Sequence, residues 1–246
     1  PYTWFFDKSR TNYERKRKCF QGVENLTIIT PSDWLAGLVK QSYLKEYPVE
    51  VINNGIDISL FKPTESDFRE CYNVCQNKIV LAIANTMSKR KGIEYIVKLP
   101  ELLPDNYKIV VVGVADEDRK MFGDKIITIS RTNNVNELVK IYAAADVFIN
   151  PTLEDNFPTT NIEALACGKP VITFKTGGSP ESVGKCGMVV EKGDLNAFAK
   201  AITDICNKNV LIEKDTCISR ARKLYSRKIF VEKYMDLYRR IIDKNR

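Results

Sequence analysis

Residues 147–168 read VFINPTLEDNFPTTNIEALACG and join a short apolar run, an acidic loop and a helix signal. The apolar run is typical of a buried strand, because the strands of a parallel sheet are covered on both faces. Pro158 marks the start of the helix and Gly168 its end, since proline is favoured at the first helical position and glycine just past the last. This stretch therefore predicts one strand and one helix of an α/β sheet.

The same alternation continues along much of the chain. Further apolar runs predict strands at residues 49–52, 79–84, 109–112, 126–129, 171–174 and 188–190. Between them, Asn134 and Glu137 have the spacing of a capping box, and an amphipathic helical pattern follows Asp194. We expect an α/β fold with a Rossmann-like, doubly wound parallel sheet.

Three regions are expected along the chain. Residues 1–48 are mostly helical in pattern, with one strand at 26–29 and a helix that begins after Pro31 and runs to about residue 42. Residues 49–226 hold the parallel sheet. Residues 227–246 form a last helix with an apolar side, which predicts that it packs on another part of the protein.

The composition excludes several classes of protein. No apolar run approaches the ~18 residues of a membrane span, and the opening aromatic run at residues 1–6 does not follow the basic segment of a signal peptide. The chain has seven scattered cysteines and no histidine. A structural zinc site is therefore not expected, and the thiols are expected to be free in a reducing cytosol.

The net charge of +7 favours an anionic partner, and much of the excess lies in residues 8–18. Two interpretations of this basic stretch remain open. It is either the solvated face of a helix or a surface that rests on anionic lipid. Few aromatic residues are interleaved with the cations, so a nucleic-acid groove is not predicted.

Ligands of an open parallel sheet bind beyond the carboxyl ends of its strands, so the segments that follow the strands are the places to search. Residues 85–92 read NTMSKRKG, follow a strand and open a helix. Free N–H groups at a helix start favour anions, Lys91 adds a cation, and Gly92 lets the backbone come close. A phosphate site and a solvated basic turn both fit this pattern.

The helix after the acidic loop places Thr159, Thr160 and Glu163 on one face, because they lie three and four residues apart. A carboxylate at Glu163 can accept hydrogen bonds from two vicinal hydroxyls, as a ribose offers, and Asp155 lies in the loop above. Plain helix capping is the alternative for both acids. The glycines at 177 and 178 allow either close approach of a ligand or only a tight turn.

The order of these motifs resembles the group 1 retaining glycosyltransferases of GT-B fold. The resemblance is carried by Lys91-Gly92, by the acid-x7-Glu pair of Asp155 and Glu163, by EALACGKPV at 163–171 and by GGSPE at 177–181. The segment EDNFPTTNIE at 154–163 is similar to the branch found in bacterial capsule and exopolysaccharide synthesis. The resemblance covers essentially the whole chain, including TPSDWL at 30–35 and INNGID at 52–57.

The resemblance implies a role for each matching residue. Lys91 would bind the donor diphosphate, Glu163 the ribose, and Asp155 the donor sugar, and these three form the expected catalytic set. The expected substrate-binding residues are Arg90, Gly92, Arg131, Thr132, Asn156, Phe157, Pro158, Thr159 and Thr160. Arg131 and Thr132 would lie near the base, and the loop at 156–160 would present N–H groups to sugar and phosphate.

The resemblance also implies the reaction. A sugar would pass with retention from a nucleotide diphosphate sugar, UDP-sugar or GDP-sugar, to a saccharide or lipid-linked acceptor in polysaccharide biosynthesis. No metal or other cofactor is expected, and the chain has no Asp-x-Asp motif. The protein would be cytoplasmic, or lie at the inner face of the membrane through a peripheral contact, with no nucleic-acid partner.

In such an enzyme, residues 1–48 would be the tail of the acceptor-side domain, residues 49–226 the donor domain, and residues 227–246 a helix that crosses back. The chain on its own is expected to bind donor without efficient turnover. A non-catalytic nucleotide-sugar-binding module that acts with a partner remains the alternative. A dinucleotide oxidoreductase would need Gly-x-Gly-x-x-Gly after an early strand, and only Gly113 follows the 110–112 run.

Two departures from the family pattern bear on the site. The first acid of the pair is usually Glu and is here Asp155, which would alter the fit of the donor sugar. An Arg usually stands about five or six residues before the Lys, where this chain has Asn85 and Thr86. Arg90 is the candidate for the missing charge.

Overall fold

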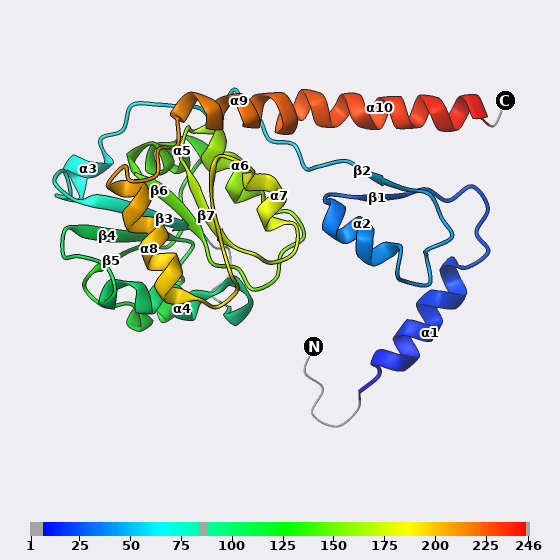
Figure 1. Ribbon diagram of the computed structural model, residues 1–246, viewed down its shortest axis with the longest axis horizontal. Coiled ribbons are helices and arrows are strands. Elements are labelled where there is room, and N and C mark those ends of the chain that lie inside the picture. The colour runs from blue at the N-terminus through cyan, green and yellow to red at the C-terminus, as the bar shows by residue number, and fades with distance from the viewer. Residues whose placement is uncertain (1–6, 84–87, 245–246) are drawn as a thin grey trace.

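The computed structural model describes residues 7–83 and 88–244. The opening aromatic run therefore lies outside the described residues, as do Ala84, at the end of one predicted strand, and Asn85 and Thr86, the two positions of the missing arginine. Within the described residues, the chain forms a large parallel sheet, a small two-stranded sheet and a long helix that lies along both (Figure 1).

The large sheet has six parallel strands in the order β5-β4-β3-β6-β7-β8. Their bounds are β3 Lys78–Ile83, β4 Tyr107–Val112, β5 Ile126–Ile129, β6 Val147–Asn150, β7 Val171–Phe174 and β8 Gly187–Val190. All six agree with strands predicted from apolar runs, to within two residues at each described end. The expected doubly wound α/β class is confirmed.

Helices cover both faces of this sheet. One face packs on α5 (Val135–Ala144), α6 (Thr159–Ala166), α7 (Ser179–Val183) and α9 (Lys214–Tyr225). The other packs on α4 (Ile93–Lys98) and α8 (Leu195–Cys206). Successive strand residues point to opposite faces, so Leu81 lies in one core and Val80 in the other, both with no exposed surface. This is why the strands are apolar throughout.

Short elements complete the larger unit. They are α3 (Phe68–Cys71) and the three 3₁₀ turns η1 (Lys89–Lys91), η2 (Leu99–Glu101) and η3 (Asp116–Met121). Asn134 caps α5, since its side chain accepts from Glu137 N at 3.0 Å, and the Glu137 carboxylate accepts from the N–H of Asn133 at 2.7 Å where the expected capping box would use that of Asn134. Asp194 caps α8 by accepting from Ala197 N at 2.9 Å. Both caps satisfy N–H groups that the first turn of a helix leaves free.

Strand order reverses between β3 and β6. From β3 the chain moves outward through β4 to β5, and it then returns to the centre and moves through β7 to β8 on the other side. The loops that leave β3 and β6 therefore diverge, and a crevice opens between them at the carboxyl edge of the sheet. Ile83 and Asn150 end these two strands and mark the crevice.

The smaller sheet pairs β1 (Ile28–Thr30) with β2 (Val49–Val51) in parallel. Residues 49–51 were expected in the large sheet, and this expectation was wrong. A short apolar run gives the period of a strand but not its partner, and β2 is only half-buried, unlike the central strands. The domain boundary expected between residues 48 and 49 would therefore separate β1 from β2, although these two strands pair in one sheet.

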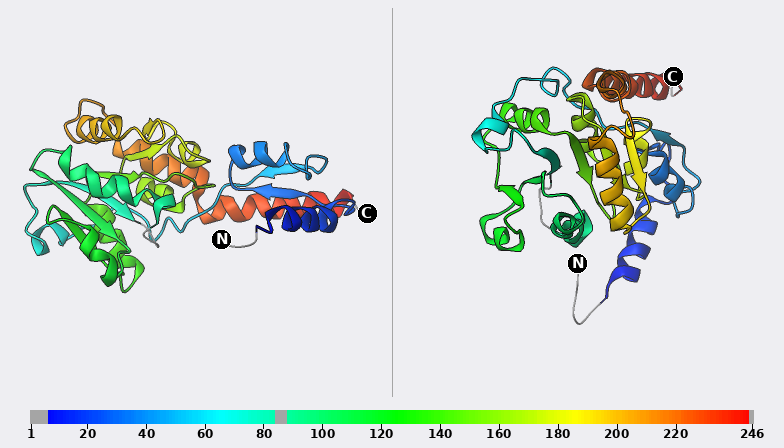
Figure 2. Two further views of the ribbon diagram at one scale, coloured as in Figure 1. Left: turned by 90° about the horizontal axis from the view of Figure 1, so that it is seen from below. Right: turned by 60° about the vertical axis from the view of Figure 1, so that its left-hand side comes forward.

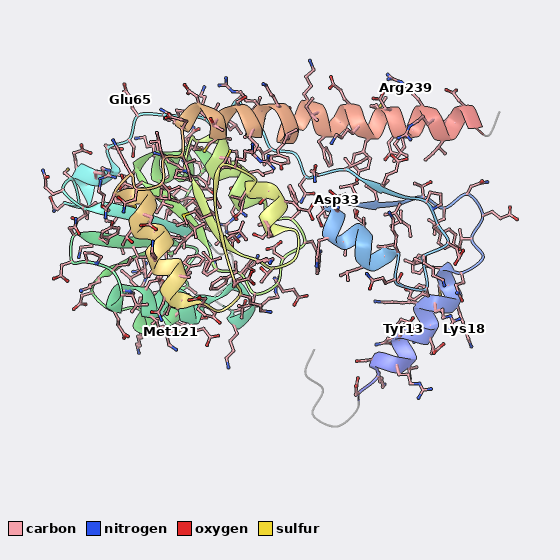
Figure 3. All side chains as sticks on the ribbon, in the orientation of Figure 1. Tyr13, Lys18, Asp33, Glu65, Met121 and Arg239 are labelled. Carbon is pink, nitrogen blue, oxygen red and sulfur yellow. The ribbon has the colours of Figure 1, made fainter. Side chains whose placement is uncertain are left out.

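Two further helices belong to this smaller lobe. Helix α2 (Asp33–Val39) begins at Ser32, whose side chain accepts from Leu35 N at 3.2 Å. Helix α1 (Ser9–Phe20) carries the basic stretch and has no buried residue. Figure 3 shows it extending from the lobe, with Tyr13 and Lys18 labelled.

Helix α10 (Arg227–Lys244) runs from the large sheet along the smaller lobe, as the views in Figures 1 and 2 agree. The linker between β2 and α3 (residues 52–67) meets the start of this helix: Ile56 N donates to Tyr225 O at 2.9 Å, and Arg227 N donates to Ile56 O at 2.7 Å. Further along, Arg240 makes two bonds to Glu50 of β2, at 3.0 and 2.7 Å. Helix α10 therefore contacts both the larger unit and the smaller sheet. This agrees with the expectation that its apolar side packs on another part of the protein.

Some negative findings concern the described residues alone. None of their helices is long and apolar enough to cross a membrane. They contain no group of three or more His, Cys, Asp or Glu side chains that could hold a metal ion. All seven cysteines lie in this part of the chain, and none of them forms a disulfide.

Candidate functional site

A cleft of about 220 Å³ lies at the point where the strand order reverses. Its lining residues are Ile83, Lys91, Asn150, Asp155, Phe157, Pro158, Thr159 and Thr160. All of them except Ile83 and Asn150 were candidates from the sequence. The loops after β3 and β6 bring them together, as the rule for open parallel sheets predicts.

The basic turn η1 presents Lys91 because Gly92 ends the turn. Gly92 has a positive φ of 74°, and a Cβ there would overlap the carbonyl oxygen of Pro151. Only glycine combines this backbone conformation with so close an approach. The turn is also fastened to the acidic loop by Leu153 N, which donates to Arg90 O at 2.8 Å.

Lys91 and Asp155 form an ion pair inside the cleft. The Nζ of Lys91 donates to Oδ2 of Asp155 at 2.6 Å, and the two side chains are 27% and 15% exposed. Partial withdrawal from water makes such a pair stronger than one on the open surface. The cleft therefore holds an ammonium and a carboxylate in direct contact, both partly withdrawn from water.

Arg90 points to the acidic loop. Its Nη1 donates to the carbonyl oxygen of Glu154 at 3.1 Å, its side chain is exposed, and it does not line the cleft. The structure thus places Arg90 as a brace between the two loops. Asn156 is exposed and also lies outside the lining, next to residues that form it.

Helix α6 supplies one wall of the cleft. Pro158 stands at its N-cap, and Thr159 and Thr160 form its first turn. The N–H groups of a first helical turn have no partner within the helix, and the dipole favours negative charge there. The wall therefore presents N–H donors to the same cleft that Lys91 lines.

Glu163 lies one turn further along α6 and is half-buried. Its Oε2 accepts from the hydroxyl of Tyr142 at 2.9 Å. Burial raises the pKa of the Glu163 carboxyl, and hydrogen bonds from Tyr142 and Thr159 partly offset this rise. Burial and the nearby Glu163 carboxylate raise the pKa of Tyr142 well above its ordinary value, so its hydroxyl is a neutral donor.

The paired glycines at 177 and 178 support the acidic loop from behind. Gly177 has a positive φ of 55°, and a Cβ there would overlap the carbonyl oxygen of Asp155. Gly178 donates its N–H to the same oxygen at 3.1 Å, and a Cβ on it would overlap Asn156 O. Of the two roles left open by the sequence, the structure favours a tight turn against the loop that carries Asp155.

Arg131 and Thr132 follow β5, which is separated from β3 by β4. Arg131 is exposed and Thr132 is half-buried. Neither lines the cleft with Lys91. They lie on the same carboxyl edge of the sheet but apart from the residues that the cleft brings together.

A buried polar network beneath the cleft was missed in the sequence. It links Asn150, Asn161, Thr173, Ser179 and Ser182, each less than a tenth exposed. Asn161 is its centre, since it accepts from Asn150 at 2.9 Å and donates to Ser179 and Ser182 at 3.1 and 2.9 Å. Polar residues at otherwise apolar positions of β6, α6 and β7 were the signal that could have revealed it.

Glu181 joins the two lobes behind the cleft. Its two carboxylate oxygens accept from the backbone N–H groups of Asp33 and Trp34, each at 2.8 Å. Figure 3 places Asp33 at the end of α2 that faces the larger lobe. A second link runs from Asn54 Nδ2 to Phe157 O at 3.2 Å. The sequence marked Glu181 only as part of a motif.

Residues 77–208, more than half of the chain, match the family described as Glycosyl transferases group 1. A Staphylococcus aureus protein, the capsular polysaccharide biosynthesis glycosyltransferase CapM, is 26% identical in an alignment that covers 72% of this chain and 50% of that protein. The Campylobacter jejuni N,N'-diacetylbacillosaminyl-diphospho-undecaprenol alpha-1,3-N-acetylgalactosaminyltransferase is 25% identical, over 81% of this chain and 56% of its own. The chain thus spans about half the length of these relatives.

The fold also matches solved structures. Anabaena HepE, solved in complex with UDP-glucose, superposes with a TM-score of 0.77 over 94% of this chain and 68% of its own, at 21% identity. At this identity, the match concerns the fold. The parallel sheet of six strands agrees with the GT-B arrangement expected from the motifs.

Proposed function

This chain belongs to the group 1 glycosyl transferases, and we propose that it is the donor-binding half of a retaining hexosyltransferase. The donor would be a nucleotide diphosphate sugar, and the acceptor a saccharide or a lipid-linked saccharide. The observation that carries the proposal is the cleft at the strand reversal, where Lys91 and Asp155 meet the first turn of α6.

The cations and donors of the cleft suit a leaving diphosphate. As the bond from sugar to phosphate breaks, negative charge grows on the diphosphate. Lys91 and the N–H groups near Thr159 would stabilise that charge, and preorganised donors of this kind contribute about 3 kcal/mol each. Since these groups supply the positive charge, the proposed reaction uses no metal or other resident cofactor.

The acids would hold the donor at its other groups. Glu163 does not itself line the cleft, but it follows Thr159 and Thr160, which do, and its carboxylate would accept hydrogen bonds from the two ribose hydroxyls. Asp155 would contact the donor sugar once the diphosphate draws Lys91 away from it. UDP is the first nucleotide to test, because HepE was solved with UDP-glucose.

The relatives guide the proposal for the acceptor. CapM is named for capsular polysaccharide biosynthesis, and the Campylobacter enzyme for a diphospho-undecaprenol substrate. We extend both to this chain as a role in polysaccharide synthesis on a saccharide or lipid-linked acceptor. The exposed basic helix α1 would then provide a peripheral contact with anionic lipid at the inner face of the membrane.

Calorimetric titration of the 246-residue chain with UDP, GDP and their common sugar conjugates tests the donor site. Binding of one nucleotide that is lost in Lys91→Ala and in Glu163→Ala would support it. Lys89→Ala is the matched control, because Lys89 lies in the same basic turn, is exposed and does not line the cleft. Equal losses in all three variants would indicate only a general effect of charge.

A folded chain that binds none of these compounds would count against the donor site in this half alone. The same titration on a protein that also carries the acceptor-side domain would then decide whether the donor assignment stands. Release of UDP or GDP measures turnover, both for the 246-residue chain and for the protein that also carries the acceptor-side domain. We expect efficient release only with both halves.

A further inference from the structure

Tyr142 is a tyrosine of helix α5 with no exposed surface. Its ring packs between two other rings, with centroids 6.2 Å from Phe61 in the linker and 5.7 Å from Phe148 of β6. Both neighbours belong to the buried side of the large sheet or pack against it. The ring is therefore held in one position by the core.

The hydroxyl of Tyr142 does not contribute to the apolar packing of the ring. A phenylalanine would fill the same space, and the hydroxyl instead leaves the core toward α6. Its nearest partner is Oε2 of Glu163 at 2.9 Å, and its second contact is the carbonyl oxygen of Thr160 at 3.3 Å. One proton is shared between them, and the shorter distance and the negative charge favour the carboxylate.

We propose that Tyr142 is a positioning residue that fixes the Glu163 carboxylate for the ribose hydroxyls of the donor nucleotide. The inference rests on the proposed donor site. A carboxylate has about four lone-pair sites. Tyr142 occupies one of them, which leaves the others for two vicinal hydroxyls. The rigid ring sets the direction in which those sites face.

The hydrogen bond from Tyr142 also favours the charged form of Glu163, which is half-buried. Burial raises the pKa of its carboxyl, and the hydrogen bond from Tyr142 stabilises the charged form against that rise. No cation pairs with Glu163 among the ion pairs of the described residues. The Tyr142 hydroxyl therefore affects the Glu163 carboxylate in two ways: it orients the carboxylate, and it stabilises the carboxylate's negative charge.

The test is Tyr142→Phe, which removes only the hydroxyl. Its matched control is Tyr107→Phe, since Tyr107 is also buried and its hydroxyl meets Asn207 at 3.3 Å. Tyr107 begins β4, at the opposite edge of the sheet from the cleft. Both variants are titrated with UDP or GDP, whichever the chain binds, and with the 2′,3′-dideoxy form of that nucleotide.

We expect Tyr142→Phe to weaken the ribonucleotide by about tenfold and to change the dideoxy form by less than about twofold. The control variant should bind both as the parent chain does. Combined with Glu163→Ala, the Tyr142→Phe change should have no added effect, because both act through one carboxylate. An equal loss for the two nucleotides, or no loss for either, would overturn the proposal.

A second measurement needs no nucleotide. Carbon-13 NMR of the Glu163 carboxyl follows its titration in the parent chain and in both variants. Loss of the Tyr142 donor should raise the pKa of Glu163 further, while Tyr107→Phe should leave it unchanged. If UDP and GDP do not bind, the proposed donor site fails, but a pKa of Glu163 that is the same in Tyr142→Phe would separately refute the link between these two residues.

Discussion

The ammonium of Lys91 donates to the carboxylate of Asp155 over 2.6 Å, from two loops that leave neighbouring strands of the sheet. The two charges satisfy each other in a partly buried cleft. A diphosphate that binds Lys91 must therefore compete with Asp155 for the same ammonium. The pair sets the cation in place, and it also lowers the net gain from binding an anion there.

Asp155→Asn should bind the free nucleoside diphosphate about threefold more tightly, because a neutral amide competes less for Lys91 than a carboxylate does. The same variant should lose preference among donor sugars if Asp155 contacts the sugar. Calorimetry with the nucleoside diphosphate and with its sugar conjugates measures both effects. Weaker binding of the plain diphosphate would contradict the competition.

Gly177→Ala should lower the free energy of unfolding by roughly 2 kcal/mol or more, because it combines a positive φ with overlap of the Asp155 carbonyl. Gly193→Ala is the control, since Gly193 has a φ of 87° and an added Cβ would meet only Tyr95 Oη at 3.4 Å. Denaturant unfolding of both variants separates backbone strain from the overlap. Equal losses would remove the argument from close packing.

Glu163→Gln should stabilise the fold near neutral pH by on the order of 1 kcal/mol, while weakening nucleotide binding. Burial raises the folded-state pKa of Glu163 above its unfolded value. The folded state therefore holds this proton more tightly, and stability falls as pH rises from the unfolded pKa through the folded one. Unfolding measured across this window should show the two chains converge on the acid side. A difference that is constant with pH would contradict the raised pKa.

Asn161→Ala should cost about 2–4 kcal/mol of stability, because it leaves the buried polar groups of Asn150, Ser179 and Ser182 without their shared partner. Asn156→Ala is the control on the exposed side of the same loop and helix. Its stability should stay within about 0.5 kcal/mol of the parent chain. Thermal unfolding compares them, and a loss at Asn161 no larger than at Asn156 would show that the network does not support the cleft.

Glu181→Ala should loosen the smaller lobe by removing the acceptor for two N–H groups of α2, an effect of about 1 kcal/mol on that helix. Hydrogen exchange of the α2 amides should speed up, while that of the central strands β3 and β6 stays slow. Glu191→Ala serves for comparison, since its exposed ion pair with Lys175 lies within the larger lobe. Unchanged exchange in α2 would argue against the link.

The large sheet could be predicted because parallel strands are apolar on both faces, so each stands out in the sequence without knowledge of its partners. The same reasoning misplaced residues 49–51, since their pattern does not reveal that Ile28 pairs with Val49. Cleft residues such as Lys91 and Asp155 could be predicted because they lie in the segments that follow strands, and the carboxyl edge is where ligands of such sheets bind.

The supporting residues were out of reach for a different reason. Nothing in the local sequence marks Tyr142, yet its hydroxyl donates to Glu163, which lies 21 positions away. Glu181 meets Asp33 across 148 positions. Local periodicity carries no information about such contacts, because they arise only when distant elements pack. The structure reveals these roles because it shows which distant residues are in contact.

Glu181 contacts Asp33 and Trp34 through backbone N–H groups alone. Any sequence that starts a helix at that place would present the same two N–H donors. The smaller lobe can therefore change its side chains at this contact, while the larger lobe must keep a carboxylate at position 181. Recombination between related proteins could therefore exchange the smaller lobe and keep the joint, provided that the new helix begins in register. At this one contact the required side chain, Glu181, belongs to the larger lobe, and the smaller lobe contributes only its backbone.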